Sequence, residues 1–325
     1  MKSQKFKLDL AGKELKVEIR NLAEQANSDV LIRFGDTLVL TTCVMSKYDR
    51  EEVDFFPLTV NYEERYYAAG KIRGSRYIRR ETRPSGEAIC NSRLVDRAIR
   101  PGFPENLKRG VQVIATVLSW DEKNDPDILS LISASLALSI SDIPWQEPIA
   151  AVRIGKINGQ FILNPNYEER EKSKIDLILA GSEKNGEILI NMIEGNFEEV
   201  EESSILEALE FSKEYLKKLV DFQREISKKI GKEKLLIETS PKDLELEKEI
   251  KKFLGNKLEK ALYQKIKVGR MEEVNRLKEE LTYFIEGKYP GQEKTRYARN
   301  FFEEEINRLV HENIIKYEKR NLEEG

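Results

Sequence analysis

The sequence predicts an α+β fold class, in which a mixed strand and helix part precedes a wholly helical part. Up to about residue 195, short runs rich in β-branched residues alternate with Gly, Asn and Asp turn signals. One long apolar run within this part has the length of a buried helix. From about residue 200, apolar residues recur at helical spacing between Glu and Lys. We therefore predict two domains, spanning residues 1–200 and 201–320.

The first four strands are expected to form a pair of hairpins. They cover residues 5–10, 14–19, 29–34 and 37–44, with turns at Gly12 and at Gly35-Asp36. The Asn158-Gly159 and Asn185-Gly186 pairs are strong signals for two further hairpins. The remaining strands are expected at residues 57–62, 110–120, 150–155, 160–163, 174–180 and 187–193.

Two helices are expected among these strands. Residues 86–100 form the first, which Pro101 ends. The second begins after Asp125, which has the side chain of an N-cap, with Pro126 as its first helical residue. This second helix is apolar nearly all round and contains small serines and alanines, so we expect it to be buried against a sheet.

The helical part begins with a predicted capping box, in which Ser204 caps the first helix and Glu207 stands three residues later. A second helix is expected to open at Ser240-Pro241 and to run toward Gly255. The pattern continues to the end of the chain and indicates at least four helices. Their Glu- and Lys-rich faces are typical of solvated helix surfaces with pairs at i and i+4.

Composition excludes several classes of protein. No apolar run approaches the ~20 residues of a spanning helix and the start lacks the apolar block of a signal peptide, which indicates a soluble, cytoplasmic chain. Cys43 and Cys90 lie in apolar stretches without CxxC spacing, so we expect buried thiols. His311 is the single histidine, which excludes histidine triads within this chain. Walker A, dinucleotide-binding and zinc-binding motifs are absent from the sequence.

Basic residues gather in one segment although the whole chain has a formal charge of only −3. Residues 71–100 contain nine basic and three acidic side chains, a local net charge of +6. Within this segment, residues 70–86 have Gly at both ends and five arginines around Tyr77 and Ile78. Arginines form paired hydrogen bonds with phosphate oxygens, and an aromatic ring stacks on bases. This segment is therefore predicted to be a loop that binds single-stranded nucleic acid. A merely solvated basic loop is the alternative.

The helix at residues 86–100 carries a basic stripe. Arg93, Arg97 and Arg100 fall on one side, whereas its apolar residues fall on the other. The helix can therefore dock on a sheet and present its arginines to a cleft. The alternative is that these arginines form internal ion pairs with acidic neighbours such as Asp96.

Asp176 is the one candidate for acid–base or metal chemistry, because it is a single carboxylate within an apolar strand. Glu168 and Glu169 stand nearby, but in a polar stretch that we expect to be mobile. One carboxylate does not make a two-carboxylate metal site. The sequence thus predicts no catalytic residue and no metal site in this chain.

Several segments resemble the bacterial polynucleotide phosphorylase family, namely residues 57–74, 79–85, 93–104 and 111–144. The resemblance spans residues 5–195 in order and continues into the helical part, which is similar to that family's all-α linker. It implies an RNase PH fold of the ribosomal protein S5 domain 2-like type and a homotrimeric ring. It also implies processive 3′ to 5′ degradation of mRNA, with inorganic phosphate as co-substrate and nucleoside diphosphates as products.

The same resemblance assigns site residues. The family's aromatic-aromatic-Arg-Arg loop at the neck of the RNA channel corresponds to Tyr77, Ile78, Arg79 and Arg80, where Ile78 replaces an aromatic. Together with the arginines of the basic segment, the RNA-binding set expected here is Tyr77, Ile78, Arg79, Arg80, Arg83, Arg93, Arg97 and Arg100.

The family's catalytic and Mg²⁺-binding residues belong mainly to a second RNase PH-like domain after the linker. The present sequence ends at Gly325, so that domain and the C-terminal RNA-binding domains are expected to be absent from this chain. Around Asp176, Arg170 and Ile178 stand where the active domain has an aspartate and a lysine. The resemblance therefore implies a catalytically silent half that builds the RNA channel and the trimer. Possible further partners are components of the RNA degradosome.

Two alternatives remain open from the sequence. The chain can be a stand-alone RNA-binding module without a catalytic partner. It can also be an enzyme that is active alone, through a site formed between subunits.

Overall fold

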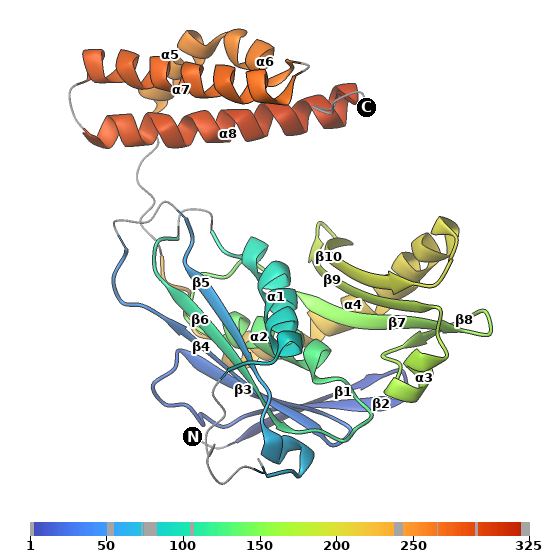
Figure 1. Cartoon of the computed structure of the whole chain (residues 1–325). Coiled ribbons are helices and arrows are strands. Elements are labelled where there is room, and N and C mark those ends of the chain that lie inside the picture. Colours follow the sequence, from blue (N-terminus) through green and yellow to red (C-terminus); the bar gives the residue numbers. More distant parts are fainter. Residues whose placement is uncertain are drawn as a thin grey trace. The chain divides into compact units, whose positions relative to one another are not determined.

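The chain folds into two compact units, Met1–Glu238 and Thr239–Gly325. The computed structural model shown in Figure 1 describes residues 3–50, 55–72, 74, 83–104, 107–236, 243–264, 266–289 and 292–319. Unit 1 contains both sheets, and unit 2 is helical. The α+β class and the helical C-terminal region are thus confirmed.

Unit 1 begins with a six-stranded sheet. Its spatial order is β1 (Gln4–Leu10), β2 (Lys13–Ile19), β3 (Ser28–Phe34), β4 (Thr37–Met45), β6 (Val111–Ser119) and β5 (Leu58–Glu63). Neighbouring strands are antiparallel except β5, which runs parallel to β6. Alternate residues of β4 are buried, as expected for a sheet with one face on the core.

The second sheet has four antiparallel strands. Its order is β10 (Glu187–Phe197), β9 (Ile175–Lys184), β7 (Ala150–Ile157) and β8 (Gln160–Leu163). The hairpin turns predicted at Asn158-Gly159 and Asn185-Gly186 are both present, and all four residues have positive φ, as a type I′ turn requires.

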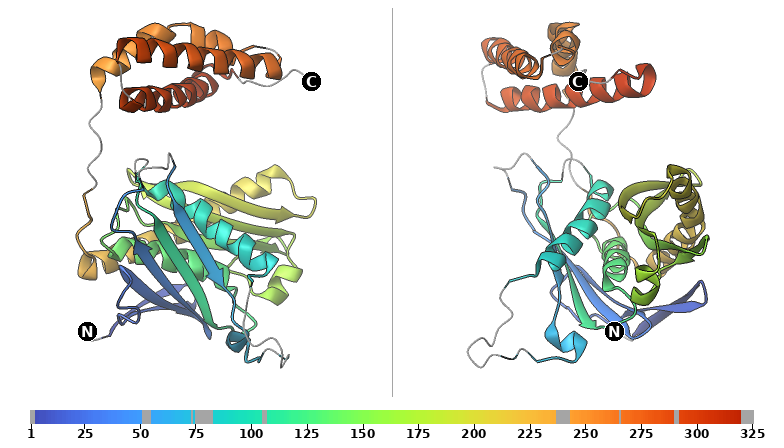
Figure 2. Two further views of the ribbon diagram at one scale, coloured as in Figure 1. Left: turned by 60° about the vertical axis from the view of Figure 1, so that its left-hand side comes forward. Right: turned by 45° about the vertical axis from the view of Figure 1, so that its right-hand side comes forward.

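Helices α1 (Gly86–Ile99) and α2 (Pro126–Ile140) lie between the two sheets (Figures 1 and 2). Every residue of α2 is buried, which confirms the prediction from its apolar sequence. Asp125 is its N-cap and Pro126 its first residue, also as predicted. The short α3 (Tyr167–Glu171) follows β8, and 3₁₀ turns cover Tyr66–Ala69 and Arg100–Gly102.

The helix α4 (Glu202–Ile230) belongs to unit 1, whereas the sequence placed it in a separate helical domain beginning at residue 201. Leu216, Leu219 and Val220 of this helix are fully buried in the same core as β7 and β9. The compact units therefore divide after Glu238. The expected capping box is also wrong, because the helix begins at Glu202 with Glu201 as N-cap and Ser204 lies inside its first turn.

Unit 2 consists of α5 (Leu244–Leu254), α6 (Lys257–Leu262), α7 (Lys267–Lys288) and α8 (Gln292–Tyr317). Its own core includes Leu254, Leu281, Ile285 and Phe302. Ser240 and Pro241, where the first of these helices was expected to open, lie outside the described residues. The helix begins at Leu244, and its N-cap Asp243 accepts a hydrogen bond from the backbone N–H of Leu246 at 3.0 Å.

Among the helices in the described ranges, none combines the length and the apolar character that a bilayer crossing needs.

Cys43 is buried, as predicted. Cys90 is exposed, so its prediction as a buried thiol is wrong; the buried residues of α1 are Ala88, Leu94, Val95, Ala98 and Ile99.

Candidate functional site

The helix α1 displays the basic stripe expected from its sequence. Ser85 caps it by accepting a hydrogen bond from the backbone N–H of Ala88 at 2.9 Å. Its buried side is formed by Leu94, Val95, Ala98 and Ile99. Arg93, Arg97 and Arg100 are exposed, so the helix docks by one face and presents its guanidinium groups on the other.

Two of these arginines already have protein partners. Arg97 lies 2.5 Å from Glu194 of β10 and donates to the carbonyl of Ile193 at 3.1 Å. Arg100 lies 2.7 Å from Asp96 and donates to the carbonyl of Phe56 at 3.2 Å. The structure thus shows internal pairing for both, which was the alternative interpretation of the stripe.

Arg93 differs, because it has no hydrogen-bond or ion-pair partner among the described residues. Arg83 is exposed just before α1 and lines a hollow of about 490 Å³ with Arg65 and Lys71. Tyr77, Ile78, Arg79 and Arg80 lie outside the described residues. Within the described part of the chain, Arg83 and Arg93 therefore retain the charge and exposure needed to meet a phosphate.

A larger cleft of about 900 Å³ adjoins this hollow and shares Arg65 and Lys71 with it. It lies where β5, β6 and the N-terminus of α2 meet, and Trp120 and Tyr167 line it with their rings in a T-shaped contact. Its further lining is mixed in charge and includes Glu64, Glu87, Glu122, Asp125, Arg153 and Arg170. The lining of the cleft therefore contains both acidic and basic side chains.

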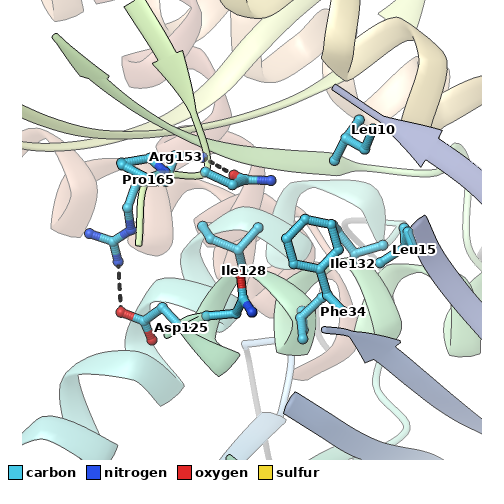
Figure 3. Close-up of a pocket in the computed structure, with 11 residues that line it drawn as sticks. Leu10, Leu15, Phe34, Asp125, Ile128, Ile132, Arg153 and Pro165 are labelled. Carbon is cyan, nitrogen blue, oxygen red and sulfur yellow. Dashed lines mark hydrogen bonds and ion pairs between the residues drawn. The ribbon is translucent and has the colours of Figure 1, made fainter. Parts of the chain in front are cut away.

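A cluster of two arginines and three aspartates lies beside this cleft, and all of its members except Asp176 line the cleft. Arg153 of β7 is only 5% exposed. Its guanidinium lies 2.6 Å from Asp176 of β9, 2.5 Å from Asp127 and 3.4 Å from Asp125. Asp125 is the N-cap of α2 and Asp127 lies in its first turn, so one buried cation joins this helix to the second sheet. Figure 3 shows the contact between Arg153 and Asp125.

Arg170 provides the second cation of this cluster. It lies 2.7 Å from Asp125 and 2.9 Å from Asp176, so that it bridges the two carboxylates. Arg170 belongs to α3, which is held by a capping box between Asn166 and Glu169. The segment around Glu169 was expected to be a mobile polar stretch; the structure shows a short helix there, held by the capping box, which brings Arg170 to Asp176.

The electrostatics of the cluster follow from its burial. Burial and the neighbouring carboxylate of Asp125 raise the pKa of Asp127 to about 7, against the opposing effect of Arg153. Burial disfavours the charge of Arg153, but the three carboxylates outweigh it and raise the pKa of this guanidinium. Arg153 therefore remains a cation throughout the physiological range.

Asp176 is consequently not the lone carboxylate that its strand suggested. Both of its oxygens accept hydrogen bonds from arginines, Oδ1 from Arg153 and Oδ2 from Arg170. Asp125, Asp127 and Arg153 were missed in the sequence. The signal available for Arg153 was a single cation inside the apolar run of residues 149–155.

Figure 3 shows an apolar cavity beside the cluster, lined by Leu10, Leu15, Phe34, Ile128 and Ile132. Its volume of about 20 Å³ is enough for one water molecule and not for an organic ligand. Asn164 also lines the cavity, and its side-chain oxygen accepts a hydrogen bond from the backbone N–H of Arg153 at 2.9 Å. The cavity is therefore part of the packing around the cluster.

Comparison with known proteins gives two family matches. The 3′ exoribonuclease family, domain 1, matches residues 11–144, and domain 2 of the same family matches residues 147–215. The second match extends into α4, in agreement with its packing in unit 1.

Curated relatives align along almost the whole chain. Polyribonucleotide nucleotidyltransferase of Bacillus cytotoxicus is 41% identical over 99% of this chain and 45% of its own length. That of Halalkalibacterium halodurans is 42% identical over 98% of this chain and 45% of its own length. The chain thus spans a little under half the length of these relatives. A solved structure, Rrp46 of rice, is similar in fold, with a TM-score of 0.50 over 69% of this chain and 94% of its own, at 13% identity.

Proposed function

Because the chain belongs to the 3′ exoribonuclease family and is a homologue of polyribonucleotide nucleotidyltransferases, we propose that it forms the non-catalytic, RNA-guiding half of a phosphorolytic enzyme. In this proposal the complete enzyme degrades mRNA from the 3′ end and uses inorganic phosphate to release nucleoside diphosphates. The present half contributes RNA contacts and assembly surfaces and does not carry out the chemistry.

The proposal that this half is not catalytic rests on the contacts of Asp176. A general acid or base must reach its substrate, and a metal ligand must offer a free lone pair. Asp176 is poorly suited to either role, because Arg153 and Arg170 each bind one of its oxygens and both guanidinium cations repel a metal ion. Within the described ranges, no group of three His, Cys, Asp or Glu side chains is arranged to hold a metal ion.

The residues present therefore do not fit the Mg²⁺ that the family implies. We propose that Mg²⁺ and phosphate are bound by a second RNase PH-like domain of the complete enzyme, and no step of the reaction is assigned to the present residues. The fact that the relatives are more than twice as long as the aligned chain supports this division.

The RNA-guiding part of the proposal rests on the distribution of charge. Arg83 and Arg93 are exposed, and both belong in sequence to the basic segment of residues 71–100 that also contains Tyr77, Arg79 and Arg80. Such side chains bind the phosphate backbone without reading its sequence. We further propose a cytoplasmic homotrimer that acts on single-stranded RNA and associates with RNA degradosome components.

Replacing Arg93 by alanine is expected to weaken the binding of a single-stranded oligoribonucleotide by about fivefold, equivalent to about 1 kcal/mol. The slope of log Kd against the logarithm of salt concentration should also decrease, by the amount expected for the loss of roughly one phosphate contact. Fluorescence anisotropy over a salt series measures both quantities. Arg308→Ala is the control, because this exposed arginine of unit 2 pairs with Glu305 and Glu312. Equal losses in the two variants would contradict a specific role for Arg93.

Restoring the aromatic residue of the family's neck loop is expected to strengthen RNA binding. A stacked base is worth about 1 to 3 kcal/mol, so Ile78→Phe should lower the Kd for a poly(A) oligomer by roughly fivefold or more. Ile78→Leu controls for a change of side-chain shape without an aromatic face. Unchanged affinity in Ile78→Phe would count against the assignment of this position to the RNA path.

A further inference from the structure

The hollow of about 490 Å³ beside α1 has an aromatic residue in its lining as well as basic ones. Tyr66, which is 49% exposed, lines it together with Lys71 and Arg83. The volume lies within the ~300 to 1,000 Å³ of ordinary ligand pockets. A nucleotide consists of a flat base, which stacks on aromatic rings, and a phosphate, which pairs with cations. The lining therefore offers both kinds of contact at one place.

The turn that carries Tyr66 is fixed to the first sheet. It is the 3₁₀ turn Tyr66–Ala69, in which Ala68 is buried and accepts a hydrogen bond at its carbonyl from the backbone N–H of Trp120 at 2.9 Å. The carbonyl of Tyr66 accepts a hydrogen bond from the backbone N–H of Lys71 at 3.0 Å, so the aromatic residue and a cation of the hollow are held together. An aromatic residue on such a turn loses little freedom when a base stacks on its ring.

The charge of the hollow is positive after its internal pair is taken into account. Arg65 lies 2.5 Å from Glu63, so these two lining residues neutralise each other. Glu64 is the remaining carboxylate among the described residues of the lining. It stands against Lys71 and Arg83, which are both exposed and have no ion-pair partner in the described part of the chain. The balance is one positive charge, which favours a phosphate group.

We propose that this hollow is a subsite for one nucleotide of a single-stranded RNA, in which the base stacks on Tyr66 and the adjoining phosphate is bound by Lys71 and Arg83. The inference rests on the proposed RNA-guiding function and adds to it a stacking residue other than those at positions 77–80. Every base has a face that can stack on an aromatic ring, so the subsite holds the RNA without reading its sequence. Tyr67 differs from Tyr66, because it is 55% exposed on the same turn but does not line the hollow.

The test measures the binding of the full chain to a poly(A) oligomer and to inorganic polyphosphate of similar length, which carries negative charge but no base. Tyr66→Leu is expected to weaken RNA binding by about fivefold or more and to leave polyphosphate binding unchanged. Tyr66→Phe keeps the aromatic face and should bind RNA as the parent does. Tyr67→Leu is the matched control on the same turn and should also bind RNA as the parent does. Arg83→Ala should weaken the binding of both polyanions and reduce its salt dependence.

A photochemical measurement on the parent keeps the test valid if Tyr66→Leu does not fold. An oligomer of 5-iodouridine forms crosslinks to aromatic rings that stack on its bases, and mass spectrometry is expected to locate a crosslink on Tyr66. Crosslinks that avoid Tyr66, or a folded Tyr66→Leu that binds RNA as tightly as the parent, would overturn this inference alone. A parent that binds no RNA would overturn the proposed RNA-guiding function and this inference together, so the two failures are distinguishable.

Discussion

Replacement of Arg153 by methionine is expected to lower the free energy of unfolding of unit 1 by about 3 to 5 kcal/mol. The substitution keeps most of the apolar volume of the side chain but removes the cation that contacts three carboxylates. Asp127 is 2% exposed and would lose its charged partner without gaining access to water. Urea unfolding followed by tryptophan fluorescence measures the change, because both tryptophans belong to unit 1.

Asp127→Asn is the matched control for this prediction. Its effect should be smaller, because burial and Asp125 already raise the pKa of Asp127 to about 7 and thus favour the neutral form. In the Asp127→Asn background, Arg153→Met should also lower the free energy of unfolding by a smaller amount, because a buried uncharged amide does not need a cationic partner. The role given to the cluster would be contradicted if Arg153→Met lowered the free energy of unfolding by less than about 1 kcal/mol. It would also be contradicted if the changes in unfolding free energy of the two single variants simply added in the double variant.

Replacement of Leu219 by alanine is expected to lower the free energy of unfolding of unit 1 by about 2 to 5 kcal/mol. Leu219 lies in α4, is fully buried, and belongs to the core that this helix shares with the second sheet. The loss combines the transfer of the leucine side chain to water with the cavity that remains. The same urea experiment measures it.

Leu206→Ala is the control in the same helix, because Leu206 is 63% exposed and should change stability by less than about 0.5 kcal/mol. If α4 were instead part of a separate helical domain, Leu219→Ala would leave the unfolding of unit 1 unchanged. Equal effects of the two substitutions would likewise contradict the division of the chain after Glu238.

Local sequence signals predicted much of the fold. The hairpins at Asn158-Gly159 and Asn185-Gly186 require positive φ, which these residues adopt easily, so the prediction depended on neighbours in sequence alone. The burial of α2 followed from its apolar sequence, and its start followed from Asp125 and Pro126. The place of α4 could not be predicted in this way. Its amphipathic pattern shows that one face is buried but does not show which core receives it.

The candidate site could be predicted only in part, for the same reason. The arginine stripe of α1 and the pairing of Arg100 with Asp96 one turn away follow from helical periodicity, whereas the partners of Arg97 come from β10. The charge cluster depends on contacts between residues far apart in sequence, such as Asp125 with Arg170. A single sequence contains no signal for such pairs. The capping box at Asn166 and Glu169 was visible and would have placed α3.

The measurement that tests the proposed function most directly is the release of nucleoside diphosphate from a poly(A) oligomer by the purified chain, with phosphate and Mg²⁺ present. RNA binding is recorded in the same samples. We expect salt-sensitive binding, because phosphate contacts release counterions, without release of nucleoside diphosphate. Phosphate-dependent release that persists through stringent purification would contradict this expectation. It would mean that the chain forms an active site of its own, and that the two arginines on Asp176 do not silence it.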